Sequence, residues 1–432
     1  MPVISTLPNE LWMEVFESVN SPSDLAQVLR TCSRFRDLAI RILHRRLIWN
    51  DPRHFAQVLQ FWTNNPGMVT VPRSLTVGIS QVPVPPLQVE RLDRAVAVVD
   101  IGGALSQAPR NGIAPPANKP VLHAPQDTMA SRFKPFYLAT QNLCQAMKSH
   151  MVTFTQLTDL SFGNALLPND IYNIIHGLPS LRVLRIENCT FDQATNPGTW
   201  DHTTLPITEL SLLGLEGGAH VTDALCLAKA HNLRVLRFDS SACVFRLFTR
   251  NNPYGQHIVP QHLESVDVRL PDKKSWPPNP PEAQQTYIAP LTEFLAMCPN
   301  VVRLVIGSYM PEFIFPPKIL PNLRSYTGPM STVITVTGSR PIRELNISDA
   351  GTKLSEWTGV LDVLGVAHPS LEELVANVPY WDDEILHAVT QLFRDLRLLR
   401  ISYALGNPSE VCDLFVYVMS AHLIDPLVGH NT

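Results

Sequence analysis

The sequence predicts an α/β protein in which a three-helix N-terminal module precedes an irregular solenoid with one strand and one helix per repeat. Residues 1–50 carry helix start signals and helical periodicity, and one strand phrase recurs about ten times from Leu157 onward. A chain of 432 residues ordinarily forms roughly two or three domains unless it is an elongated repeat. We therefore expect a helical domain over 1–50, the start of the solenoid over 51–78, an insertion over 79–134 and the solenoid proper over 135–432.

Start signals predict three short helices near the N-terminus. Pro8 suits the first turn of a helix, where its missing N–H would be unpaired anyway. Ser21 and Pro22 supply an N-cap and a first-turn proline for a second helix. Thr31 or Ser33 caps a third.

The first of these helices is apolar on two sides. Leu7, Leu11 and Val15 recur at four-residue spacing, and an adjoining face carries Trp12, Phe16 and Val19. A helix with two apolar sides needs two neighbours. The third helix has an apolar face formed by Phe35, Leu38, Ala39, Ile42 and Leu43, and a basic face formed by Arg34, Arg36, Arg41, Arg45 and Arg46.

This N-terminal arrangement resembles the F-box, a three-helix module of substrate receptors in SCF-type cullin-RING ubiquitin ligases. The matching residues are Leu7, Pro8, Glu10, Leu11, Val15, Phe16, Asp24, Leu25, Val28, Cys32, Arg34, Phe35, Leu38 and Trp49. Many family members have Trp where Phe35 stands. Periodicity alone would equally describe an ordinary helical subdomain, whereas the joint occurrence of these residues favours the F-box. The resemblance implies that the Skp adaptor is contacted, or the contacting surface supported, by Leu7, Pro8, Leu11, Val15, Phe16, Leu25, Val28 and Phe35.

Composition limits the classes of partner. Apolar residues make up 45% of the chain, charged residues 17%, and the formal net charge is -4. A general nucleic-acid binder needs a concentrated positive field, so we expect no nucleic-acid partner. The arginines between Arg30 and Arg46 form a local basic strip, which fits a solvated helix face or one that meets an acidic adaptor.

No secretory leader and no long apolar run are visible in the sequence. We therefore expect a cytoplasmic or nuclear protein that is neither secreted nor membrane-bound. The seven cysteines include no C-x-x-C pair, which argues against a disulfide framework and against a zinc cluster. They are interpreted as small buried hydrophobic residues.

Residues 79–134 are irregular and rich in proline. Because proline removes backbone donors and breaks helices, most of this stretch should be loop or disordered. A loop this long is either functional or simply inserted, and we favour insertion.

A leucine-rich repeat is the second resemblance. The clearest copy runs from Leu181 to Phe191 and follows the spacing L-x-x-L-x-L-x-x-C-x-L in all but its aromatic last position. Other copies start at Leu157, Ile207, Leu233, Leu263, Val301, Leu323, Ile342, Leu371 and Leu396. Helical patterns between them cover 171–176, 222–230, 287–297, 354–366 and 382–393, whereas the interval between Leu323 and Ile342 is too short for a good helix. Strand and helix alternation could also form a compact parallel sheet, but the recurring phrase favours a solenoid, capped by a final helix over 410–421.

The sequence contains no motif for chemistry. It lacks a P-loop, a G-x-G-x-x-G after a strand, H-E-x-x-H and G-x-S-x-G, so we expect a non-catalytic protein without a cofactor or a metal. His257 and His262 lie in a proline-flanked loop with spacing unsuited to a metal site. Capping and the helix dipole explain the acidic run from Asp382 to Glu384.

The lining of the solenoid is a better candidate for recognition. In this repeat phase the third and fifth positions face the concave sheet, and they carry both signs of charge. The predicted substrate-binding residues are Arg185, Arg237, Asp267, Arg303, Glu344 and Arg400. We hypothesise that Arg185, Arg237 and Asp267 form one patch for a mixed-charge protein surface, although a solvated face without a partner would look the same. A P-x-x-P run over 277–281 is either a peptide ligand or an insertion loop, and we favour the loop.

Together these features predict the substrate-recognition subunit of an SCF-type E3 ligase, which reaches a cullin through the Skp adaptor and holds a protein substrate on its solenoid. The alternative is an F-box scaffold that pairs with the adaptor outside any ligase. An unrecognised enzyme has no supporting motif.

Overall fold

The computed structural model describes residues 7–19, 21–50, 55–78, 146–167, 171–191, 200–215, 224–239, 262–271, 274, 276, 287–307, 315–338, 340–348, 354–380 and 382–405. The predicted insertion, the P-x-x-P run, His257 and the predicted capping helix lie outside these residues. The chain divides into two compact units. Unit 1 comprises Met1–Leu157, Phe162–Leu166 and Asn173–Leu178, and unit 2 comprises Thr158–Ser161, Leu167–Tyr172 and Pro179–Thr432.

Unit 1 begins with the three predicted helices, α1 (Asn9–Glu17), α2 (Pro22–Val28) and α3 (Ser33–Leu43). The prediction that Pro8 lies in the first turn of α1 was wrong, because Pro8 is the N-cap and has non-helical backbone angles. Ser21 caps α2, since its Oγ accepts from the backbone N–H of Asp24 at 3.4 Å. The prediction for the start of α3 was wrong, because its N-cap is Cys32, whose sulfur accepts from the N–H of Phe35 at 3.4 Å. Cys32 is exposed, in contrast to buried Cys189 and Cys298, so the expectation of buried cysteines fails there.

The chain leaves α3 earlier than its basic pattern suggested. The helix ends at Leu43, so Arg45 and Arg46 lie beyond it instead of on its basic face. Arg46 opens strand β1 (Arg46–Trp49), which pairs in parallel with β2 (Ser74–Val77). Helix α4 (Phe55–Asn64) and the 3-10 turn η3 (Pro66–Met68) connect the two strands. The His44 ring stacks on Phe61 of α4 with centroids 4.5 Å apart.

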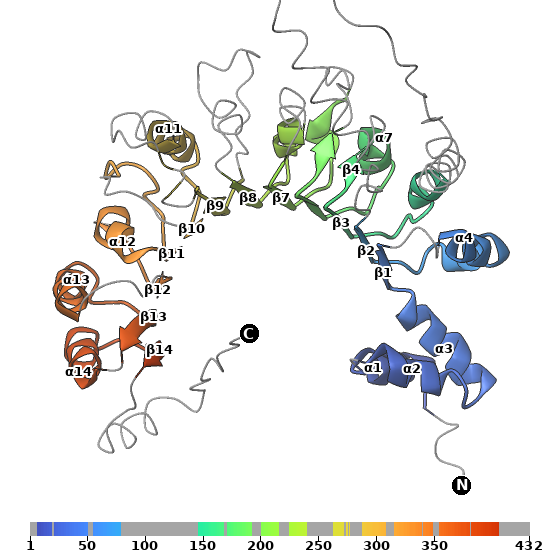
Figure 1. The fold of residues 1–432 in the computed structure, drawn as a ribbon, viewed down its shortest axis with the longest axis horizontal. Coiled ribbons are helices and arrows are strands. Elements are labelled where there is room, and N and C mark those ends of the chain that lie inside the picture. Colours follow the sequence, from blue (N-terminus) through green and yellow to red (C-terminus); the bar gives the residue numbers. More distant parts are fainter. Residues whose placement is uncertain are drawn as a thin grey trace, which may run out of the picture. The chain divides into compact units, whose positions relative to one another are not determined.

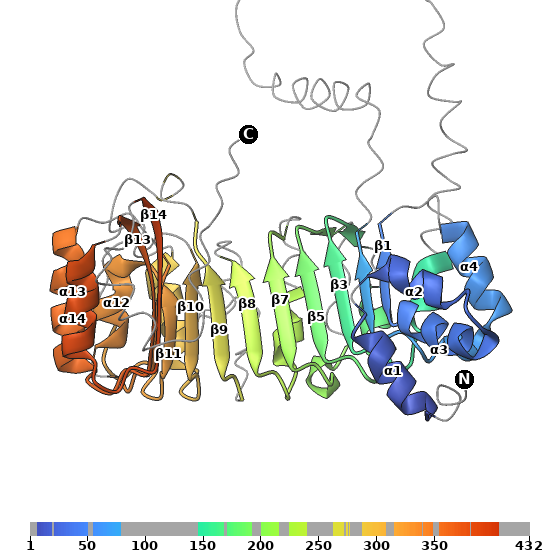
Figure 2. The same cartoon turned by 90° about the horizontal axis from the view of Figure 1, so that it is seen from below.

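Unit 2 is a parallel sheet in which each strand pairs with the next strand of the series (Figures 1 and 2). The strands are β5 (Val183–Glu187), β7 (Glu209–Leu213), β8 (Val235–Asp239), β9 (Ser265–Arg269), β10 (Arg303–Gly307), β11 (Ser325–Gly328), β12 (Glu344–Ile347), β13 (Glu373–Tyr380) and β14 (Leu398–Leu405). Strand β3 (Asp159–Gly163) falls at the division between the units, and the short strands β4 (Leu166–Leu167) and β6 (Thr190–Phe191) form a separate two-stranded sheet.

One hydrogen-bond pattern recurs before every strand of this series. The carbonyl of Arg182 accepts from the N–H groups of both Thr208 and Glu209, at 2.8 and 3.0 Å. The carbonyl of Thr208 does the same for Arg234 and Val235. This sequential order of parallel strands confirms the repeat and excludes a doubly wound sheet, in which the order reverses part-way.

Helical segments lie on one side of the sheet in unit 2 (Figure 1). They are η5 (His202–Thr204), η7 (Cys226–Lys229), α11 (Ala289–Ala296), α12 (Met330–Thr337), α13 (Leu354–Ala367) and α14 (Asp383–Leu392), and α7 (Ile171–His176) spans the division. The expectation that the interval before Ile342 could not hold a helix was wrong. The turn into α12 closes tightly, because the Tyr326 and Thr332 hydroxyls share a hydrogen bond of 2.5 Å and Thr332 also donates to the Pro329 carbonyl at 2.8 Å.

The core of unit 2 lies between the sheet and these segments. Alternate strand residues are buried, as Leu184 and Ile186 show on β5 and Leu236 and Phe238 on β8. Phe238 meets Phe294 of α11 edge to face at 5.6 Å. The other residues of each strand therefore form a sheet face that points away from the helices, which we call the open face.

Candidate functional site

The three N-terminal helices close around a small core of their own. Phe16, Leu25, Leu38 and Ala39 are buried, with partly buried neighbours that include Trp12, Val28 and Phe35. Three aromatic rings contact one another, since the Trp12 and Phe35 centroids lie 4.6 Å apart and those of Phe16 and Phe35 lie 5.3 Å apart. This core uses the Phe16 side of α1 and leaves its other apolar side unused.

That unused side is an exposed apolar stripe, formed by Leu7, Pro8, Leu11 and Val15. Leu7 is 39% exposed, Leu11 46% and Val15 49%. Leu11 and Val15 lie on α1, and Leu7 and Pro8 directly precede it. A partner that covers such exposed apolar side chains gains about 25 cal/mol per Å² of area removed from water. The stripe is therefore a candidate docking surface for another protein.

The predicted adaptor-binding residues divide into two groups in the structure. Leu7, Pro8, Leu11 and Val15 form the stripe. Phe16 and Leu25 are core residues, so they fit only a supporting role, and Val28 and Phe35 are partly buried against the same core.

Arg34 holds the beginning of the stripe in place, a role that its assignment to a solvated basic face missed. Its Nε donates to Asn9 Oδ1 at 2.9 Å, and its Nη2 donates to the Leu7 carbonyl at 2.5 Å. These bonds tie Leu7, just before α1, and Asn9, its first residue, to α3 across 27 and 25 positions of sequence. An ion pair also joins Arg45 to Glu17.

The open face of unit 2 presents a second candidate surface. Arg185, Ser211, Arg237 and Asp267 are register partners on β5, β7, β8 and β9. Arg237 Nε lies 3.9 Å from Asp267 Oδ2. Burial raises the pKa of the Asp267 carboxyl, and the guanidinium groups of Arg237, Arg269 and Arg303 oppose that rise.

The structure brings only some of the predicted substrate-binding residues together. Arg185, Arg237 and Asp267 share one row, and Arg303 pairs in register with Ser265, on the strand that carries Asp267. Glu344 on β12 and Arg400 on β14 are separated from this group by intervening strands, so the six residues do not form one patch.

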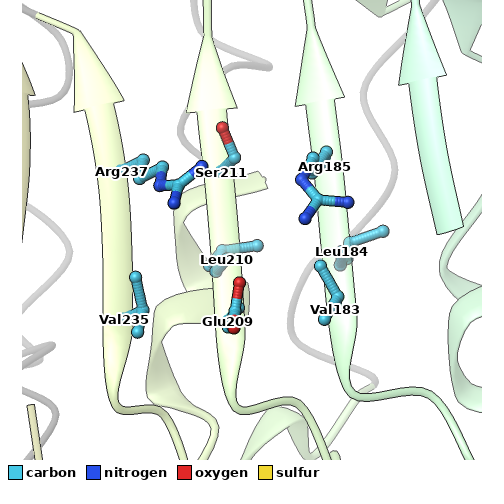
Figure 3. Close-up of a pocket in the computed structure, with 8 residues that line it drawn as sticks. All are labelled: Val183, Leu184, Arg185, Glu209, Leu210, Ser211, Val235 and Arg237. Carbon is cyan, nitrogen blue, oxygen red and sulfur yellow. The ribbon is translucent and has the colours of Figure 1, made fainter. Parts of the chain in front are cut away.

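A shallow depression lies over β5, β7 and β8 and is lined by Val183, Leu184, Arg185, Glu209, Leu210, Ser211, Val235 and Arg237 (Figure 3). Ser211 is 3% exposed and its Oγ donates to Glu187 Oε1 at 3.0 Å. The sequence analysis gave no binding role to Ser211, Glu209 or the two valines. The signal available in the sequence was the fifth repeat position, which holds Arg185, Ser211 and Arg237 in three successive copies.

Metal binding and membrane insertion can be assessed for the described residues. Within them, no cluster of three or more His, Cys, Asp or Glu side chains is placed to hold a metal ion. Among the same residues, no helix has the length and apolar character needed to cross a membrane.

Comparison with known proteins bears first on the N-terminus. Residues 4–48 match the F-box-like family. The N-terminal module is therefore an F-box-like domain, and unit 2 that follows it is a parallel-strand repeat. No curated protein matches the chain.

Solved structures show only distant likeness. An internalin from Listeria monocytogenes is 17% identical over 60% of this chain and 58% of its own, with a TM-score of 0.27. A Bacteroides fragilis protein is 12% identical over 59% of this chain and 67% of its own, with a TM-score of 0.31. A plant peptide hormone receptor in complex with RGF2 is 11% identical over 59% and 37%, with a TM-score of 0.20. At these scores the repeat assignment rests on the strand register described above.

Proposed function

We propose that this chain is a non-catalytic substrate-recognition subunit of an SCF-type cullin-RING E3 ubiquitin ligase. Its F-box-like domain would bind the Skp adaptor, which bridges to the cullin, and unit 2 would hold a protein substrate. The observation that carries the proposal is the apolar stripe of Leu7, Pro8, Leu11 and Val15, left exposed by a domain that already has its own core.

The mechanism proposed for the chain is proximity. The RING subunit and the conjugating enzyme perform the covalent step, and this chain raises the effective concentration of substrate lysines beside the activated thioester. The chain needs no catalytic group for this role. It would act in the cytosol or nucleus, with its adaptor.

Co-expression with a Skp adaptor and a cullin tests the proposal. Replacing Leu11 and Val15 together by Asp puts two charges into the proposed interface, and the loss of two apolar contacts of about 1.5 to 3 kcal/mol each should weaken adaptor binding by about a hundredfold or more. The matched control is Val363→Asp on α13, since Val363 is 45% exposed. Thermal unfolding should change little in either variant.

The outcomes separate three possibilities. Adaptor and cullin recovered with the wild type, and both lost with the double variant, support the ligase subunit. Adaptor recovered without cullin favours the alternative, an F-box scaffold that works outside a ligase. Recovery of neither contradicts both. Proteins that bind the wild type and whose half-lives lengthen with the double variant would identify substrates.

A further inference from the structure

The depression on the open face has a regular composition that follows from the strand register. One row, across β5, β7 and β8, reads Val183, Glu209 and Val235. The next row reads Arg185, Ser211 and Arg237. We call these six residues the β7 site. Figure 3 shows that one row has an acid between two valines and the other has a serine between two arginines.

The upper row suits a monovalent anion. Arg185 and Arg237 lie on strands separated by β7, which places their Cα atoms roughly 9.5 Å apart. Ser211 lies between them, and its Oγ donates to the Glu187 carboxylate at 3.0 Å, so two guanidinium charges meet one acid there and leave a net charge of about +1 for a monovalent anion. Among the described residues Arg185 has no carboxylate partner, and Arg237 has only the long contact with Asp267 at 3.9 Å. Both guanidinium groups can therefore turn to a carboxylate over Ser211.

The lower row suits a cation with an aliphatic stem. Glu209 is half-buried between two valines, and no described cation pairs with its carboxylate. Lys and Arg side chains pack their methylene groups on apolar surface while their charged ends reach an acid. Glu209 also lies two residues along the strand from Ser211, about 6.6 Å away, and so disfavours a doubly charged phosphate in the upper row.

We propose that the β7 site binds one acidic and one basic side chain of the same protein segment, the carboxylate over Ser211 and the cation at Glu209. The two rows are about 6.6 Å apart, which matches residues i and i+2 of an extended segment, or i and i+3 or i+4 on a helix. This deepens the proposed function by naming the chemistry of the substrate segment. It differs from a recognition patch centred on Asp267, because Glu209 supplies the negative charge.

Immobilised synthetic peptides on an uncharged Gly/Ser/Ala background test the site with the full-length protein. One set carries Asp and Lys at each of the three spacings in both orders, and matched sets carry only Asp, only Lys, or phosphoserine with or without Lys. Two exposed ion pairs of about 0.5 kcal/mol each should make the best mixed-charge peptide bind about twofold more tightly than either single-charge peptide, which keeps one of the two pairs, and about fivefold more tightly than the uncharged background peptide.

Variants assign the two rows separately. Arg185→Ala combined with Arg237→Ala should remove the advantage conferred by Asp, and Glu209→Ala should remove the advantage conferred by Lys. Arg324→Ala and Asp395→Ala, at exposed positions outside the β7 site, serve as controls and should leave both preferences unchanged. Unfolding curves that overlay those of the wild type confirm that each variant is folded.

Several results would overturn the proposal. They are equal binding of single-charge and mixed-charge peptides, stronger binding of phosphoserine peptides, no binding of any peptide, or a preference that survives the β7-site variants. The assay needs no adaptor, so the Leu11 and Val15 variant should keep the peptide preference. A wild-type chain that binds no adaptor but shows the peptide preference would refute the ligase role alone.

Discussion

The stripe and the open face of unit 2 are both candidate protein-binding surfaces, but the stripe is apolar and the open face carries charged residues. The stripe consists of Leu7, Pro8, Leu11 and Val15 and carries no charge of its own. The rows of the open face alternate arginines and acids with small or apolar residues. Apolar burial supplies affinity in proportion to area, whereas arranged charges discriminate between partners and set orientation.

This difference suits two kinds of partner. An apolar surface suits a partner that is always the same, because its binding free energy depends on the buried area and tolerates little variation. A charged surface suits a partner that must be selected among others, because mismatched charges weaken binding. The following predictions test whether this division holds, from the largest expected effect to the smallest.

Phe16 and Val15 are neighbours in sequence with opposite roles, and their substitution should give the largest contrast. Phe16→Ala removes a side chain that is 4% exposed and should lower the free energy of unfolding of the F-box-like domain by about 3 to 5 kcal/mol. Val15→Ala, at a residue 49% exposed, should cost under about 0.5 kcal/mol but still weaken adaptor binding. Chemical denaturation followed by tryptophan fluorescence measures both free energies of unfolding. A destabilising Val15→Ala would mean that the stripe belongs to the core.

This contrast also marks what the sequence could predict. The spacing of Leu7, Leu11 and Val15 showed that α1 is apolar on two sides, but periodicity does not say which side the domain keeps for itself. Packing against α3 through Phe35 decides that question. The start of each strand, by comparison, could be predicted closely, because β5 begins two residues after Leu181 and β8 two residues after Leu233.

What escaped prediction depends on contacts that are distant in sequence or on an unusual group. Cys32 caps α3 with a sulfur atom, where hydroxyl and carboxylate oxygens are the usual signal. The depression over Ser211 arises only when β5, β7 and β8 are aligned in register. Helix α12 fits its short interval through a hydroxyl pair that no spacing rule indicates.

The second prediction concerns Arg340, whose charge we expect to stabilise the fold and not to take part in recognition. Its side chain is 4% exposed, and it donates to the carbonyls of Ile319 and Pro316 at 2.9 Å each and to that of Val336. Burial lowers the pKa of this guanidinium. Arg340→Met leaves buried carbonyls unpaired and should cost about 1 to 3 kcal/mol of unfolding free energy. Arg185→Met on the open face should cost under about 0.5 kcal/mol.

Unfolding of Arg340→Met should be followed by urea titration, with peptide binding measured on the same samples. We expect Arg340→Met to keep its peptide preference while folded, and Arg185→Met to show a weaker preference for Asp. The reverse pattern would show that charges on the open face contribute to stability and not to recognition.

His368 should make the stability of unit 2 depend on pH. It is 3% exposed, and burial lowers its pKa from the ordinary value of 6.5. The unfolded chain therefore binds a proton at a pH where folded His368 does not, so its contribution is present above pH 6.5 and is lost as pH falls from there toward the folded pKa. His368→Leu should flatten the curve of unfolding free energy against pH below pH 6.5. His150 in unit 1, whose pKa burial also lowers, supplies a parallel dependence that the substitution leaves in place.

The smallest expected effect is the difference between the two surfaces in how binding depends on salt. Raising ionic strength from about 0.1 to 1 M shortens the Debye length from about 10 to 3 Å, which screens exposed charges and leaves apolar contacts unweakened. Binding of the mixed-charge peptide should weaken by about two- to fivefold, the full advantage of two exposed ion pairs. Adaptor binding through the stripe should stay constant or tighten. Equal salt sensitivity of the two, measured by titration calorimetry, would mean that the basic residues of α3 contribute to the adaptor interface and that the division between an apolar and a charged surface is wrong.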